Sequence, residues 1–292
     1  MVREIGTIGD GHGRQNAQRH RPQRRDREAD TFRRTPQSTR VETRGSVARL
    51  ADYRDGLLLA IKSAGKDHWE RHLAGDELIH ILDGTKTLEI VCDARPPKSF
   101  ELRAGMIVVI PQGAWHRSYS EGTTTMSAVP FPGENIEVDV DDPRTVESKP
   151  VVTTTMPRIV DFDGELTKLT MFRGRTPGST ISDRKGSTAR LATYRDGALL
   201  ASKWAGKGHW EIHRGGDELV HIVEGAAILE ILGDSGSQSF ALHAGMMAVT
   251  PQGAWHRFHS SEGVTLLTAT PFPSEVIEVD VDDPRTVETR RN

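Results

Sequence analysis

One segment of this sequence occurs twice, and this internal repeat limits the folds that the chain can adopt. Tyr53-Arg54-Asp55-Gly56 returns 141 residues later as Tyr194-Arg195-Asp196-Gly197. Phe100 and its counterpart Phe240 are 140 residues apart, and matched residues near the end of the repeat are again 141 apart. The two copies therefore differ in length only where loops are expected, which predicts two domains with one fold.

Short apolar segments separated by turn residues fill each copy. Residues 106–110 are predicted to form a buried strand, which Pro111-Gln112-Gly113 ends. Residues 78–82 and 88–91 flank Asp83-Gly84, and this pattern predicts a hairpin with a tight turn. Neither copy shows the period of an amphipathic helix. We therefore expect an all-β fold of two tandem barrels or jelly rolls, each built from short strands.

Composition and charge narrow the classes of function. The chain has 292 residues and a formal net charge of -3, which indicates neither a nucleic-acid-binding nor a membrane-bound protein. Its single cysteine, Cys92, excludes an internal disulfide, and the matching residue of the second copy is Gly233. The sequence contains neither an apolar run long enough to span a bilayer nor the core of a signal peptide. These features predict a cytoplasmic protein.

The repeat also sets the expected domain boundaries. Residues 1–30 are polar and rich in arginine, which predicts a disordered basic arm, to which we assign no function. The first barrel is expected over residues 31–150, a linker over 151–170 and the second barrel over 171–292. Two barrels with one fold are expected to pack as a pseudo-twofold pair. Further assembly into a homo-oligomer is left open.

Histidines and carboxylates recur at two-residue spacing in both copies. In the first copy, His68, Glu70 and His72 share one face of a predicted strand, because side chains alternate along a strand. Glu77 and His116 lie near the starts of two further strands and converge with them if these strands are neighbours. Two histidines with one or two carboxylates form a ligand set for Fe(II), Mn(II), Ni(II) or Zn(II), with positions left for substrate or water.

The second copy repeats this set at the same spacing. Its members are Glu211, His213, Glu218 and His256. His209 takes the place of His68. His80 and His221 lie on the opposite face of their strands and are expected to be structural. The sequence therefore predicts one metal site in each barrel.

Two motifs in each copy resemble those of the cupin superfamily, and their duplication resembles a two-domain bicupin. The first cupin motif has the form G-x5-H-x-H-x3/4-E-x6-G, and residues 70–84 and 211–225 share its spacing with glutamate in place of the first histidine. The second motif, G-x5-P-x-G-x2-H, is matched by residues 105–116 and 245–256. The resemblance covers nearly all of residues 35–292 and implies two double-stranded β-helix barrels.

The resemblance also carries the superfamily's remaining ligand positions onto this chain. They fall on His72, Glu77, His116, His213, Glu218 and His256. Glu70 and Glu211 stand at the position of the first histidine and are predicted to complete a shell of two histidines and two glutamates, to act as a base, or to point aside. His68 and His209 are candidates to substitute for the missing histidine. A carboxylate-rich shell favours Mn, Fe or Zn over Cu.

The resemblance implies a protein with one divalent metal ion (Fe, Mn, Zn or Ni) in each barrel and a small organic molecule as substrate. The chemistry expected first is that of a dioxygenase-type oxidoreductase, with Glu70 or Glu211 as the catalytic residue that accepts a proton. One alternative is a metal-assisted isomerase, cyclase or decarboxylase, which needs no O₂. Another is a non-catalytic cupin that binds a small ligand, so the sequence leaves open whether the chain is an enzyme.

Overall fold

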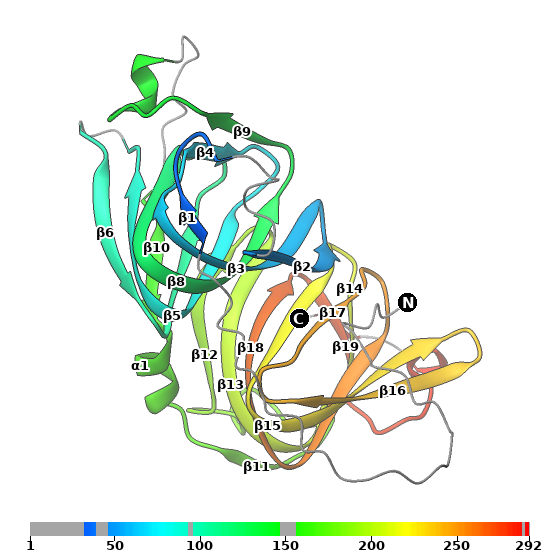
Figure 1. The fold of residues 1–292 in the computed structure, drawn as a ribbon. Helices are drawn as coiled ribbons and strands as arrows, with labels where there is room; N and C mark the ends of the chain where they lie inside the picture. The colour runs from blue at the N-terminus through cyan, green and yellow to red at the C-terminus, as the bar shows by residue number, and fades with distance from the viewer. Residues whose placement is uncertain (1–31, 39–45, 93–95, 147–155, 288–289, 292) are drawn as a thin grey trace, which may run out of the picture.

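The computed structural model describes residues 32–38, 46–92, 96–146, 156–287 and 290–291. Within these residues the chain forms two ten-stranded sheets, one for each copy of the repeat, and each sheet curls into a barrel (Figure 1). The first barrel is coloured blue to green and the second yellow-green to red. The all-β prediction is confirmed, and the predicted arm at 1–30 lies outside the described residues.

The first sheet is organised around β8, its long central strand. Its described strands are β1 (Phe32–Arg34), β2 (Val47–Tyr53), β3 (Gly56–Lys66), β4 (Trp69–His72), β5 (Glu77–Ile90), β6 (Lys98–Arg103), β7 (Met106–Ile110), β8 (His116–Pro130), β9 (Gly133–Ile136) and β10 (Arg158–Asp161). β8 pairs antiparallel with β3 along one edge and with β5 along the other. β4 pairs with β9 and with the first residue of β8. The starts of β4 and β8 therefore lie side by side.

The second sheet repeats this arrangement around β18. Its described strands are β11 (Phe172–Arg175), β12 (Thr188–Tyr194), β13 (Gly197–Lys207), β14 (Trp210–His213), β15 (Glu218–Gly233), β16 (Gly236–His243), β17 (Met247–Thr250), β18 (His256–Pro271), β19 (Ser274–Ile277) and β20 (Arg290–Arg291). β18 pairs antiparallel with β13 and β15, and β14 pairs with β19 and with the first residue of β18.

Short helical segments interrupt the described strands. They are η1 (Pro143–Thr145), α1 (Phe162–Thr167) and η2 (Pro284–Thr286). The Asp161 side chain caps α1 by accepting a hydrogen bond from the Gly164 N–H. β10, just before α1, pairs with β7, so part of the segment expected as a linker extends the first sheet. The domain boundaries given above stay predictions. None of the described helices has the length and hydrophobicity needed to cross a lipid bilayer.

The prediction of a hairpin at Asp83-Gly84 is wrong. β5 continues through these residues, pairing first with β7 and then with β6, while β8 runs along its other edge. The register against β8 shifts between Ile81 and Asp83, and Gly84 has a φ of +79°. A Cβ at Gly84 would lie 2.2 Å from the carbonyl oxygen of Gly122. The residues typical of a tight turn form a bulge here, which bends one long strand.

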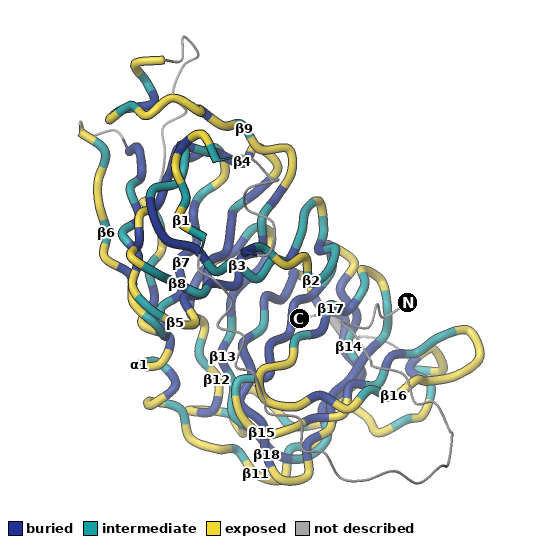
Figure 2. The backbone as a smooth tube through the Cα atoms, viewed as in Figure 1, coloured by how far each residue is buried: buried dark blue, intermediate teal, exposed yellow. Residues whose placement is uncertain are grey.

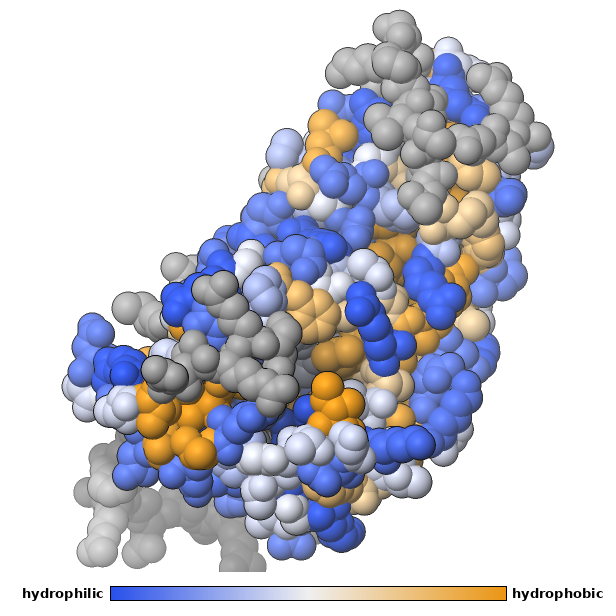
Figure 3. Space-filling model, turned by 180° about the vertical axis from the view of Figure 1, so that it is seen from behind, coloured by the Kyte–Doolittle hydropathy of each residue, from blue (hydrophilic) through white to orange (hydrophobic). Residues whose placement is uncertain are grey.

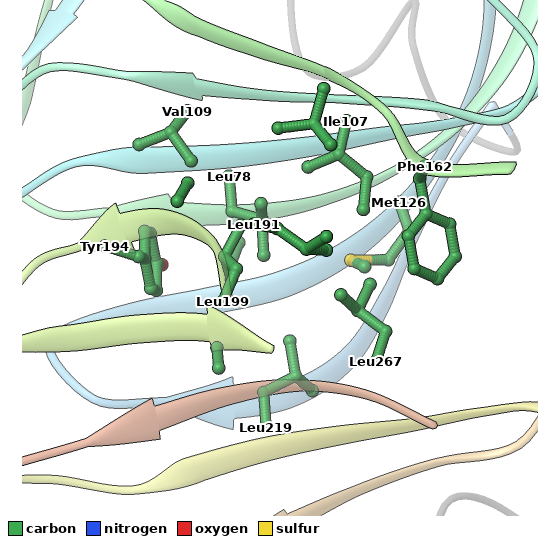
Figure 4. Close-up of a cluster of buried hydrophobic side chains, with 14 of the residues drawn as sticks. Leu78, Ile107, Val109, Met126, Phe162, Leu191, Tyr194, Leu199, Leu219 and Leu267 are labelled. Carbon is green, nitrogen blue, oxygen red and sulfur yellow. The ribbon is translucent and has the colours of Figure 1, made fainter. Parts of the chain in front are cut away.

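Apolar side chains of both barrels form one shared core between them (Figure 4). The first barrel contributes Leu78 and Met126, and the second contributes Leu199, Leu219 and Leu267. Buried residues run along the strands of both barrels, while exposed residues gather in connecting segments and at the outer edges (Figure 2). On the face seen in Figure 3, hydrophobic residues lie in several groups among hydrophilic ones. Since burial of one such side chain contributes about 1.5–3 kcal/mol, the shared core ties the barrels together.

Reciprocal polar contacts accompany this shared core. The backbone N–H of Arg54 donates to the Asp217 carboxylate at 2.9 Å. In the matching contact, the backbone N–H of Arg195 donates to the Asp76 carboxylate at 3.0 Å. Equivalent residues exchange equivalent contacts, which is the pattern of a twofold interface. The two barrels therefore pack as a pseudo-twofold pair.

Candidate metal centres

Three strands of each barrel bring the predicted ligands together. β4 carries Glu70 and His72, Glu77 opens β5, and His116 opens β8 directly opposite Glu70. The second barrel gathers Glu211, His213, Glu218 and His256 in the same way. In each barrel one ligand atom from each of the four residues lies within 4.8 Å of the others. The structure thus brings together all eight residues predicted as metal ligands, as two potential metal sites.

In the first barrel, the two histidines approach Glu77 most closely. Nε2 of His116 lies 2.9 Å from Oε2 of Glu77, and Nε2 of His72 lies 3.3 Å from the same oxygen. Oε1 of Glu70 lies 3.8 Å from Nε2 of His116. Glu70 is partly exposed, whereas the other three residues are buried. Three of the four ligand residues are therefore shielded from solvent, and Glu70 is the most exposed member.

The second cluster has a similar arrangement, although Nε2 of His213 lies 3.7 Å from Oε1 of Glu218. Nε2 of His256 lies 3.1 Å from Oε2 of Glu218 and 3.8 Å from Oε1 of Glu211. Nδ1 of His256 lies 3.1 Å from the carbonyl oxygen of Ala254, as Nδ1 of His116 does from its own upstream carbonyl at 3.0 Å. Because a carbonyl only accepts, Nδ1 of each histidine donates to it, and Nε2 is left as the ring atom that faces the carboxylates and would bind a metal.

The donor atoms of these clusters fit a divalent cation. Several of them are buried and have no hydrogen-bond partner among the described residues: Nε2 of His72, His116 and His213, and Oε2 of Glu77. Buried polar atoms without partners are costly, so their convergence calls for a ligand. Two neutral imidazoles and two carboxylates match the preferences of Mn(II), Fe(II) or Zn(II) and balance a charge of +2.

Protons hold the clusters together when no metal is bound. Burial lowers the pKa of His72 and His213, but the adjacent carboxylates of Glu77 and Glu218 outweigh it and raise both pKa values to about 9. Burial raises the pKa of Glu218, but the charge of His213 outweighs this and lowers the pKa to about 2. A metal ion must therefore displace protons from the histidines.

His68 and His209 lie beside the clusters, not within them. Nε2 of His68 is 3.5 Å from Oε2 of Glu70, and Nε2 of His209 is 3.5 Å from Oε2 of Glu211. Burial raises the pKa of Glu211, but the hydrogen bond and charge of His209 outweigh it and lower the pKa. Neither glutamate points aside: each carboxylate lies between its cluster and the adjacent histidine.

His80 and His221 lie away from both clusters, as expected. Their ring centroids are 5.9 Å apart across the boundary between the barrels, and His80 also packs edge-on against Phe162 of α1 at 5.4 Å. These histidines are part of the packing between the barrels.

Two supporting side chains of the second cluster were not predicted from the sequence. Ser274, in β19, lies with Oγ 3.0 Å from Nδ1 of His213. Thr270, in β18, donates from Oγ1 to Oε1 of Glu218 at 2.6 Å. The equivalent residues of the first barrel are Gly133 and Val129, which cannot make these bonds. The repeat offset was the signal that could have found this difference.

A cavity of about 180 Å³ adjoins the second cluster, and Glu211, Glu218 and His209 are among its lining residues. Its wall also includes Arg175, which the sequence did not single out as a site residue. The second cluster is thus a metal-ligand set placed at the wall of a space for a small molecule.

Comparison with known proteins gives a family match within the second barrel and a shared fold for both. Residues 203–269 match the family model for a cupin domain. No curated protein sequence matches the chain. The solved structure of oxalate decarboxylase from Bacillus subtilis at pH 4.6 aligns with 79% of this chain and 73% of its own, at 11% identity and a TM-score of 0.51. Another Bacillus subtilis oxalate decarboxylase structure, from work on its Mn(II) centres, aligns with 79% of this chain and 74% of its own, at 11% identity and a TM-score of 0.48.

The matched segment runs from within β13 to within β18 and contains the whole second cluster. The first barrel repeats this segment in sequence, in strand order and in the geometry of its cluster. Similarity to the first of these decarboxylase structures, at 11% identity, adds the two-barrel architecture alone. The second barrel therefore contains a cupin domain, and the chain has the two-barrel fold of a bicupin, with a glutamate at the first histidine position of the cupin motif in both of its barrels.

Proposed function

We propose that this bicupin is a divalent-metal-dependent enzyme that decarboxylates a small organic acid, and that its second barrel carries out the reaction. The observation that carries the proposal is the cluster of Glu211, His213, Glu218 and His256 at the wall of a cavity. The fold shared with Bacillus subtilis oxalate decarboxylase favours a decarboxylase over the dioxygenase expected first from the sequence.

The residues of the second cluster are suited to hold the metal. His213 and His256 would bind through Nε2, and Glu211 and Glu218 through a carboxylate oxygen. A bound divalent ion would supply Lewis acidity and orient the substrate. Ser274 and Thr270 fix His213 and Glu218 in place, and such supporting bonds preserve the geometry of metal ligands.

The pair of His209 and Glu211 is suited to hold the proton that decarboxylation requires. When the bond between the carboxyl group and its neighbouring carbon breaks, CO₂ leaves and its electron pair remains on that carbon, which must then take up one proton. His209 and Glu211 are 3.5 Å apart and both line the cavity, so one proton shared between them lies next to the substrate space. This assigns Glu211 to proton transfer, with the first barrel's Glu70 in the equivalent position.

The test is to load the purified full chain with Mn(II), Fe(II) or Zn(II) and measure CO₂ release from a panel of small organic acids without O₂. The proposal predicts one CO₂ per molecule of acid consumed, with hydrogen in place of the carboxyl group in the product. A His256→Ala variant serves as the control and should release none. Metal-loaded protein that releases no CO₂ from any acid would contradict the proposal.

Dioxygenase chemistry remains the second candidate, because two histidines with carboxylates also suit Fe(II) and O₂. It predicts turnover only with O₂, at a fixed ratio of O₂ to substrate, so an oxygen electrode separates it from decarboxylation. A non-catalytic binding role predicts saturable ligand binding with neither CO₂ release nor O₂ uptake.

A further inference from the structure

Two equivalent arginines beside the clusters have different partners. Arg34, in β1, ends a strand that runs parallel to β3, and Arg175, in β11, does the same beside β13. Nη1 of Arg34 lies 3.1 Å from Oδ1 of Asp67. Gly208 takes the place of Asp67 in the second barrel. The backbone N–H of Asp67 donates to a carbonyl of β8 at 2.8 Å, and the backbone N–H of Gly208 donates to the equivalent carbonyl of β18 at 2.8 Å. The second barrel therefore lacks the carboxylate that neutralises the arginine in the first.

The other residues around Asp67 change together with it. Ser118 donates to Oδ2 of Asp67 at 2.6 Å, and Nζ of Lys86 lies 3.9 Å from the same oxygen. Their counterparts in the second barrel are Phe258 and Ala227. A polar network in the first barrel thus becomes an apolar wall in the second.

The Arg175 guanidinium stacks on Trp204, 4.4 Å from the ring centroid, and Trp204 stands where the first barrel has a serine. Its Nε has no hydrogen-bond partner, and no carboxylate in the described parts of the chain forms an ion pair with it. Burial, and then the charge of Arg184, lowers the pKa of Arg175 to about 10. Arg184 lines the same cavity. The charge of Glu211 acts in the opposite direction but offsets only part of this lowering, so an anion that binds beside Arg175 would stabilise its charge.

We propose that the cavity of the second barrel binds a small carboxylate with an apolar body, anchored by Arg175, and that Asp67 fills the equivalent position in the first barrel. The proposal rests on the proposed function in one respect, that this cavity is the substrate pocket.

The first barrel shows the geometry that such an anchor takes. The Asp67 carboxylate lies between the guanidinium of Arg34 and the hydroxyl of Ser118. In the second barrel, the carboxylate of the proposed ligand would take the equivalent position, next to Gly208. A Cβ added to Gly208 would lie 3.0 Å from the carbonyl oxygen of Phe258 and 3.7 Å from both Cζ and Nη2 of Arg175, so the side-chain position at this glycine lies beside the guanidinium. Arginine is the side chain best shaped to hold a carboxylate through two hydrogen bonds.

The other residues that line the cavity indicate what the rest of the ligand, apart from its carboxylate, looks like. Leu200, Phe258, Leu266, Phe272 and Val276 line the cavity with apolar surface. The volume of about 180 Å³ lies below the roughly 300 Å³ at which pockets for drug-sized ligands begin. A metal ion balanced by two glutamates would leave no net charge to attract an anion, which leaves that role to Arg175 and to Arg184 at the wall of the same cavity. An organic acid with one small apolar or aromatic group meets these conditions, whereas oxalate leaves the apolar wall uncovered.

Isothermal titration calorimetry of the metal-loaded full chain with benzoate, benzamide and oxalate tests the proposal. We expect benzoate to bind at one site per chain and benzamide, which has the same ring without the charge, at least about 10-fold more weakly, as loss of a charged hydrogen bond implies. Oxalate should also bind more weakly than benzoate at this site.

Gly208→Asp transplants the carboxylate of the first barrel and should weaken benzoate binding at least about 10-fold. Its matched control, Gly208→Ala, adds a Cβ without charge and should bind benzoate like the parent. Arg175→Gln, a second variant for the case that Gly208→Asp does not fold, should show the same loss. Equal binding of benzoate and benzamide, or full benzoate affinity in both charge variants, would overturn the proposal.

The proposed function can fail separately. Benzoate binding that depends on Arg175, without CO₂ release from any acid, would support the carboxylate pocket and reject the decarboxylase. Decarboxylation that Gly208→Asp and Arg175→Gln leave unchanged would reject the pocket and keep the decarboxylase.

Discussion

The two barrels share strand order and metal-ligand set, yet they differ in what surrounds the ligands. In the second barrel, Ser274 and Thr270 support the cluster, and an arginine without a carboxylate partner faces the adjoining cavity. In the first, glycine and valine replace the supporting residues, and Asp67 pairs with the arginine. Duplication thus kept the donors and changed their neighbours. We therefore expect the two barrels to resemble each other in metal binding and to differ in the binding of a substrate.

The largest expected effect comes from removing the carboxylate that we assign to proton transfer. Glu211→Gln should lower turnover by about 10²- to 10⁴-fold, as loss of a general acid or base does. Glu70→Gln is the matched change in the first barrel and should leave most of the turnover. Steady-state kinetics on both variants, with metal content measured in parallel, checks this. An equal loss in the two variants would contradict the assignment of catalysis to the second barrel.

A smaller effect is expected from exchanging the supporting residues between barrels. Thr270→Val removes the donor to Glu218 and should weaken metal binding in the second barrel by about 10- to 100-fold. Val129→Thr in the first barrel is the reverse change and should strengthen binding there. Competition with a metal-sensitive dye measures both affinities. If neither affinity changes, the difference between the barrels is not set by these residues.

The pH dependence of metal binding follows from the raised histidine pKa values. Because His72 and His213 have a pKa of about 9 without metal, both are protonated at neutral pH and a metal must displace those protons. Metal affinity in each barrel should therefore rise by about tenfold per pH unit for each proton displaced, up to pH 9, and then level off. Metal titrations in buffers of different ionisation enthalpy would count the protons released. An affinity that is flat from pH 6 to 9 would contradict this.

The smallest effect concerns the boundary between the barrels. Burial first, and then the charge of His221, lowers the pKa of His80 to about 4. A histidine with a lowered pKa in the folded state contributes stability above its unfolded pKa of 6.5, and this is lost as pH falls toward 4. His80→Gln should flatten the dependence of Tm on pH in this range. Each kcal/mol of unfolding free energy corresponds to a shift in Tm of roughly 2–4 °C. Calorimetry of metal-free protein at pH 4 to 7 measures it, and parallel curves for parent and variant would refute the role.

The repeat and the ligand positions could be predicted because both are local in sequence. Glu70 and His72 are two residues apart on one strand, and the Pro-Gly turn places His116 at the start of another. Ser274 and Arg175 could not be found in this way, because they meet the cluster and its cavity through pairing of strands distant in sequence. The Asp83-Gly84 prediction failed for a related reason. A positive φ serves a hairpin and a bulge equally well, and only the neighbouring strand decides between them.

Anomalous diffraction from crystals of the full chain soaked in Mn(II) tests the central claim, that both clusters hold a divalent metal and that the second is better built. The account predicts one peak among Glu211, His213, Glu218 and His256 at low Mn(II), and a second peak in the first barrel at higher concentration. Absence of a peak in the second cluster, or filling of the first cluster before it, would contradict the account.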